Sequence, residues 1–147
     1  MINPFDPRTA LLAKHAQHVA LIHFPIALFI VGVIFDALGA WTKRELFASA
    51  AFLNLSAAAF TVPFAVFTGI LAWQLQLEGE RLKGILLYHL LAALVSAVII
   101  LASWWVHFRA RRGGIGLGAW RFSFEFMGIG MVALTGHLGG FLSGVNF

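Results

Sequence analysis

Long uninterrupted runs of apolar residues dominate the pattern along the chain. Four of these runs are long enough to cross the hydrocarbon core of a membrane, which takes about 20 residues at roughly 1.5 Å of helical rise each. They cover residues 19–41, 46–75, 84–106 and 118–145. Transmembrane strands would instead alternate apolar and polar positions, and the runs do not alternate. The pattern therefore predicts an all-α protein with four transmembrane helices.

The connections between these runs are short, at residues 42–45, 76–83 and 107–117. Short connections force neighbouring helices to run antiparallel, which predicts an integral membrane four-helix bundle of up-down-up-down topology over residues 19–147. Residues 1–18 precede it as a short amphipathic segment. They lack the cationic start and the small-residue cleavage site of a signal peptide, so we expect the first span to be retained.

Composition supports the membrane assignment. Hydrophobic residues make up 61% of the chain and charged residues 11%, against roughly 45–50% and about 25% in an average soluble domain. A water-soluble monomer and a disordered chain are thereby excluded. The formal charge of +4 is too dispersed to form a phosphate-binding stripe, so we expect no nucleic acid partner. Since the chain has no cysteine, thiolate metal sites and covalently attached haem are excluded as well.

Basic residues near the helix ends predict the orientation, because cytoplasmic loops carry an excess of lysine and arginine. The side with the first and third connections carries six of them, and the opposite side carries four. The six are Lys43, Arg44, Arg109, Arg111, Arg112 and Arg121, and the four are Arg8, Lys14, Arg81 and Lys83. We therefore expect the first side to be cytoplasmic and both termini to lie on the outer side.

Three histidines fall at a similar depth once the chain is threaded in this way. His23, His89 and His137 come from the first, third and fourth helices, each roughly 6–12 Å below the outer surface by helical rise. Ionisable side chains inside a bilayer face the bundle interior or a partner, and imidazole is a versatile metal ligand. The three positions therefore predict a cofactor-binding or metal-binding site.

Haem b is the cofactor that suits this site best, because it is flat and apolar and fits between helices. His23 and His89 would lie on diagonal helices and supply the two axial ligands. His137 would then donate a hydrogen bond, contact a propionate or act as an alternative ligand. Three alternatives stay open: a compact zinc or copper site of three histidines, a (bacterio)chlorophyll held by one histidine, and histidines that only hydrogen-bond between helices.

The other histidines have simpler interpretations. His15 and His18 precede the first helix and are expected to be solvated. His107 follows the third run directly and is interpreted as a residue at the cytoplasmic membrane boundary.

Charged residues near the cytoplasmic helix ends form a second candidate. Asp36 and Glu125 lie in the first and fourth helices, which are adjacent in a closed ring, and Arg121 stands one turn before Glu125. Arg121 can pair with either acid. We interpret the set as a structural ion pair, with a proton access point as the alternative. Proton pumping is not expected, because no chain of carboxylates crosses the middle of the membrane.

Side-chain catalysis finds no support in the sequence. No nucleophile elbow or HExxH motif is present, and the glycine-rich stretch Gly113–Gly118 follows no strand, so it is interpreted as a linker. We therefore expect no catalysis by this chain alone.

Two motifs resemble those of a widespread family of small bacterial four-helix membrane proteins of unknown function. They are IHFPIALF at Ile22–Phe29, followed by Asp36, and TGHLGG at Thr135–Gly140. Members of that family carry His-Phe-Pro-Ile-Ala in the first helix, a histidine early in the third and Gly-His-x-Gly-Gly in the fourth. Those positions correspond here to His23, His89 and His137.

The resemblance implies a multi-pass protein of the bacterial inner membrane. Some relatives are joined to c-type cytochrome domains, which implies electron transfer and a c-type cytochrome as a partner. An upstream His-Pro of the family is not present, since Ala16 follows His15 and Val19 follows His18. A ligand role for those two histidines is correspondingly disfavoured.

These observations lead to two hypotheses of function. The first is a membrane-embedded, b-type cytochrome-like electron-transfer subunit of a larger bioenergetic complex, with other membrane subunits and the lipid bilayer as its surroundings. The second is a cofactor-free structural or assembly subunit of a membrane complex, whose phenylalanine-rich outer faces contact its partners.

Overall fold

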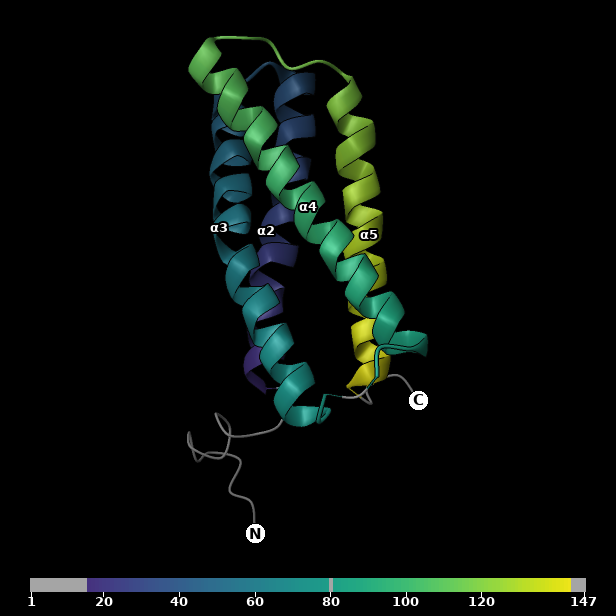
Figure 1. The fold of residues 1–147 in the computed structure, drawn as a ribbon. Coiled ribbons are helices and arrows are strands. Elements are labelled where there is room, and N and C mark those ends of the chain that lie inside the picture. Colours follow the sequence, from purple (N-terminus) through teal and green to yellow (C-terminus); the bar gives the residue numbers. More distant parts are fainter. Residues whose placement is uncertain (1–15, 80, 144–147) are drawn as a thin grey trace.

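The computed structural model describes residues 16–79 and 81–143, and within them the chain forms four helices (Figure 1). They are α2 (Ala16–Thr42), α3 (Glu45–Gln76), α4 (Gly84–Gly113) and α5 (Trp120–Leu142). Each is long and apolar enough to cross a membrane, so the prediction of four such helices is confirmed. Of the predicted N-terminal segment 1–18, residues 1–15 lie outside the described part and residues 16–18 begin α2.

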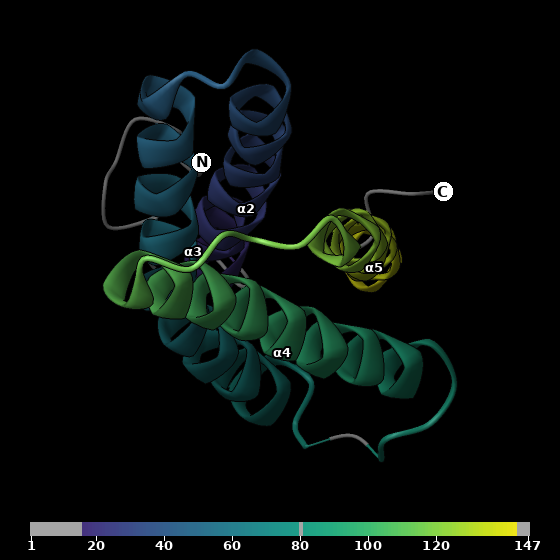
Figure 2. The same cartoon turned by 90° about the horizontal axis from the view of Figure 1, so that it is seen from above.

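Consecutive helices run in opposite directions and form a ring (Figures 1 and 2). The closest pairs are α2 with α3 and α4 with α5, while looser contacts of α3 with α4 and of α2 with α5 complete the ring. The predicted adjacency of the first and fourth helices is therefore present. Helix α4 crosses the bundle obliquely, beginning beside α5 and ending beside α3 (Figure 1).

Small residues let α2 and α3 approach each other closely. A Cβ atom on Gly32 would meet the side chain of Leu55 at 3.0 Å, and one on Gly39 would meet the backbone nitrogen of Ala48 at 3.1 Å. Buried Ala51 and Ala58 continue this seam along α3. Because lipid removes the hydrophobic drive between helices, close backbone packing of this kind is a main source of their association in membranes.

Gly128 of α5 marks the tightest crossing in the core. A Cβ atom there would lie 2.6 Å from Cγ2 of Ile99 and 2.8 Å from Cζ of Phe29. Both neighbours are buried, and Val132 lies one turn further along α5 in the same apolar cluster. The crossing therefore joins α2, α4 and α5 near the middle of the bundle.

Most of the apolar surface faces outward. Between 17% and 28% of the most apolar window of each helix is buried inside the bundle. Large apolar side chains such as Phe60, Phe67 and Val98 are exposed on the outer faces. An apolar surface of this extent is stable only in contact with lipid or with other membrane proteins, so the bilayer surrounds these helices.

Burial is uneven along the bundle. We call the part made of residues 17–28, 63–91 and 133–143 the open half, which is the lower half in Figure 1. Among its described side chains only Pro25 is buried, whereas the buried core lies in the other half. The open half therefore has no packed core of its own.

Candidate functional site

Four charged or titratable side chains are buried together in the upper half of the bundle. Asp36 of α2 is 4% exposed, His107 of α4 is 4% exposed, and Arg121 and Glu125 of α5 are 7% and 1% exposed. We call these four residues the charged cluster. Burying a charged side chain costs free energy unless the charge is paired, so the partner of each of these residues has to be identified.

Arg121 pairs with Asp36, as the sequence predicted for one of the two acids. Its Nε donates to Oδ2 at 2.6 Å and its Nη2 donates to Oδ1 at 3.3 Å. Its Nη1 donates to the carbonyl oxygens of Leu117 and Gly118 at 3.0 Å each. The fork-shaped contact and the two carbonyl acceptors provide four hydrogen bonds for the five N–H groups of the guanidinium.

Glu125 pairs with His107 instead, whose Nε2 donates to Oε1 at 2.9 Å. His107, interpreted from the sequence as a residue at the membrane boundary, is therefore also a buried partner of α5. The predicted third span ended at residue 106, but α4 continues to Gly113 because no helix breaker precedes the glycine pair that ends it. The additional turns carry His107 against α5 and bring Arg111 to Glu45 of α3 at 3.2 Å.

The spacing of polar residues along α4 contained the signal for His107. Ser96, Ser103 and His107 are separated by seven and four residues, which places them on one face of a helix. All three are buried on that face in the structure. An apolar helix with polar residues on one face turns that face toward the bundle interior.

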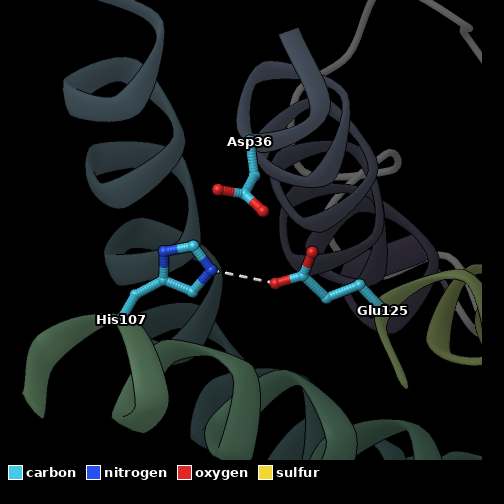
Figure 3. Close-up of side chains that lie close together, drawn as sticks. All are labelled: Asp36, His107 and Glu125. Carbon is cyan, nitrogen blue, oxygen red and sulfur yellow. Dashed lines mark hydrogen bonds and ion pairs between the residues drawn. The ribbon is translucent and has the colours of Figure 1, made fainter. Parts of the chain in front are cut away.

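Two atoms near this cluster have no hydrogen-bond partner. They are Oε2 of Glu125 and Oγ of Ser103, both fully buried. Figure 3 shows the carboxylates of Asp36 and Glu125 and the ring of His107 turned toward one another. One ligand atom from each of these three residues lies within 4.8 Å of the others, and within the described part of the chain no other such group of three forms.

The predicted site histidines lie in the open half. His89 of α4 is half-buried, and its Nδ1 donates to the carbonyl oxygen of Thr135 on α5 at 3.1 Å. The ring also contacts α5 closely, since a Cβ atom on Gly139 would lie 3.2 Å from its Cε1. Because Nδ1 carries the proton, the free lone pair of this imidazole is on Nε2.

His23 and His137 are both exposed. The Nδ1 of His23 donates to the carbonyl oxygen of Val19, so its Nε2 also carries the lone pair. The ring of His137 meets that of Phe141 edge-on, with 4.9 Å between centroids. His137 follows Gly128 by nine residues, two and a half turns, and therefore points away from the buried face of α5.

The structure thus does not gather the three predicted histidines into one compact group. His23, His89 and His137 are all described, and they are not among the side chains with ligand atoms within 4.8 Å of one another. A paired axial role for His23 and His89 is a separate arrangement and stays a prediction. His18 reaches α3, where its Nδ1 shares a hydrogen bond with Oγ1 of Thr68 at 3.1 Å, and His15 lies outside the described residues.

The comparison with known proteins gives one match. A family model described as "Predicted membrane protein (DUF2231)" matches residues 14–145, a range that includes all four helices. No curated protein and no solved structure matches the chain. The match agrees with the expected membrane protein family and carries no activity with it.

Proposed function

The chain belongs to the DUF2231 family of predicted membrane proteins, and from this premise we propose that it is a membrane-embedded, b-type cytochrome-like electron-transfer subunit. The proposed cofactor is haem b, held in the open half by His89 of α4 and His23 of α2. The bound group would supply one-electron redox chemistry at its iron. The chain's own residues would ligate the iron, orient the ring and exclude water.

The hydrogen bond of His89 is the observation that carries this proposal. Metal-ligating histidines usually donate their second ring proton to a carbonyl or carboxylate, which fixes the tautomer and the ring orientation. His89 donates Nδ1–H to the carbonyl oxygen of Thr135 at 3.1 Å. Ser96 supports the same residue, since Oγ of Ser96 lies 3.0 Å from Oγ1 of Thr135. This hydrogen bond fixes the orientation of the His89 ring and leaves the lone pair of Nε2 free to act as a ligand.

The second proposed ligand, His23, has the same tautomer through its bond to Val19. Helices α2 and α4 are opposite members of the ring, so a group bound between them would take one ligand from each. Among the described side chains of the open half only Pro25 is buried, so an inserted apolar ring would supply contacts that the other side chains there lack. Exposed His137 is then a contact for a propionate at the edge.

The proposed orientation places the open half toward the periplasm of a bacterial inner membrane. At the opposite end of the bundle, Arg121 is buried against Asp36. We therefore no longer count it among the basic residues that indicate the cytoplasmic side. The remaining five basic residues there are Lys43, Arg44, Arg109, Arg111 and Arg112. The periplasmic open half would exchange electrons with a c-type cytochrome domain or another subunit of a larger complex.

We expect the purified protein to show a Soret band and, after dithionite reduction, a sharp α band. His89→Ala and His23→Ala should each abolish the low-spin spectrum, because each removes an axial ligand. His137→Ala removes the proposed propionate contact but no iron ligand, so as the matched control it should keep the low-spin spectrum. A colourless protein, or unchanged spectra in both axial variants, would refute the assignment.

A cofactor-free structural or assembly subunit is the second candidate. The exposure of His23 and His137 favours it, because the exposed side chains of these helices are largely apolar and also suit contact with a partner subunit. A colourless, metal-free protein would support this candidate. A red-absorbing magnesium pigment would instead indicate (bacterio)chlorophyll, and zinc or copper lost in all three histidine variants would indicate a metal site.

A further inference from the structure

We propose that Asp36, His107 and Glu125 of the charged cluster form a binding site for one first-row divalent metal ion, such as Zn²⁺. The three ligands come from three helices, α2, α4 and α5, so the ion would join them at a single point. The site is separate from the histidines of the open half and does not depend on the haem proposal.

The donor set and its spacing fit a metal ion of this class. Two carboxylates and one imidazole offer hard oxygen and borderline nitrogen ligands, a combination used for zinc, iron and manganese. One ligand atom from each residue lies within 4.8 Å of the others, and all three residues are buried. Small adjustments of these side chains would bring the ligands to the roughly 2.0–2.2 Å at which zinc binds nitrogen and oxygen.

An unsatisfied carboxylate oxygen provides an independent indication of a ligand. Oε2 of Glu125 is fully buried and has no hydrogen-bond partner, and it points to the side of Asp36 (Figure 3). Buried polar atoms almost always have a partner, and an orphaned one is costly. The hydroxyl of Ser103, one turn before His107 on α4, is also buried and without a partner, and it can serve a water that completes the coordination shell.

The charges of the cluster favour a cation as well. With neutral His107, Asp36 and Glu125 carry two negative charges against the single positive charge of Arg121. A metal ion would bind Nε2 of His107, with the proton of the neutral imidazole on Nδ1, and would take Oε2 of Glu125 as its carboxylate ligand. Arg121 need not leave, since each oxygen of Asp36 has a second lone pair for a ligand bond.

The competing arrangement has no metal. If His107 is protonated, two cations and two anions balance, and the cluster is a closed network of ion pairs. This arrangement leaves Oε2 of Glu125 unsatisfied, which is why the metal site is preferred here.

The test is a zinc titration of the full-length protein in detergent after treatment with a chelator. We expect one Zn²⁺ per chain by elemental analysis and a binding isotherm of matching stoichiometry. Glu125→Gln and His107→Gln should each weaken binding at least about tenfold. Glu45→Gln, an exposed carboxylate at the same end of the bundle, is the matched control and should bind as the wild type does.

The proposal is overturned if the wild type takes up no stoichiometric zinc, or if Glu125→Gln and His107→Gln bind it unchanged. Should either variant fail to fold, X-ray absorption of the zinc-loaded wild type decides, because the site requires oxygen ligands together with imidazole. A shell without imidazole, or one built of imidazoles alone, contradicts it. By helical rise His107 lies about 27 Å along α4 from His89. Substitutions in the charged cluster should therefore remove zinc, whereas substitutions of His89 or His23 should remove the haem spectrum.

Discussion

Replacing Arg121 by alanine is expected to destabilise the bundle by about 3–5 kcal/mol, because it leaves a buried carboxylate without its partner. Asp36 receives two hydrogen bonds from this guanidinium, at 2.6 and 3.3 Å, and is itself buried. Unfolding in detergent micelles, followed by circular dichroism against a denaturant, measures the loss.

A double variant separates two contributions to stability: the destabilisation caused by a buried charge without a partner, and the stabilisation that the ion pair itself provides. Asp36→Leu combined with Arg121→Met removes both charges at similar volume and should recover most of the lost stability. The exposed pair of Arg111 and Glu45, with side chains 42% and 81% exposed, is the control. Arg111→Ala should cost no more than about 1 kcal/mol. Equal losses for Arg121→Ala and Arg111→Ala would contradict the argument.

Gly128→Leu is expected to prevent native packing of the bundle. Even a Cβ atom at this position would lie 2.6 Å from Ile99 and 2.8 Å from Phe29, and both neighbours are confined by the core. Overpacking by single methylene groups costs about 1–3 kcal/mol, and a leucine inserts four carbon atoms. We expect loss of the monodisperse peak in size-exclusion chromatography.

Gly130→Leu, two residues along the same helix, is the matched control. A Cβ atom on Gly130 meets nothing within 4 Å, and the residue is exposed. A leucine there faces outward and has better helix propensity than glycine, so the variant should behave as the wild type. If both variants fail, the fourth helix requires glycine for a reason other than the crossing at Gly128.

The four helices could be predicted from the sequence because the length of an apolar run directly reflects membrane thickness. The ends of the helices were harder to predict from the sequence, as α4 shows. Its apolar run stops at Val106, but the chain stays helical to Gly113 because arginine and alanine favour helix as well. Hydropathy indicates which residues can lie in the hydrocarbon core, and it does not indicate where the helical hydrogen bonding of the backbone ends.

Of the two pairs in the charged cluster, only that of Asp36 with Arg121 could be predicted from the sequence. Adjacency of the first and last helices placed Arg121 near Asp36, and their pairing followed from charge alone. The partner of Glu125 depended on the rotation of α4 and on helical turns beyond the predicted end. The open half raises the same difficulty, because equal depth of His23, His89 and His137 does not specify which way each ring points.

The division of the bundle into two hairpins has a consequence for its biogenesis. Asp36 belongs to the hairpin of α2 and α3, while Arg121 belongs to the hairpin of α4 and α5. Before the two hairpins pack together, Asp36 and Arg121 therefore each lack the partner that they have in the bundle. Packing of one hairpin against the other pairs the two charges, so a chain in which only the first hairpin has inserted leaves the carboxylate of Asp36 without this partner.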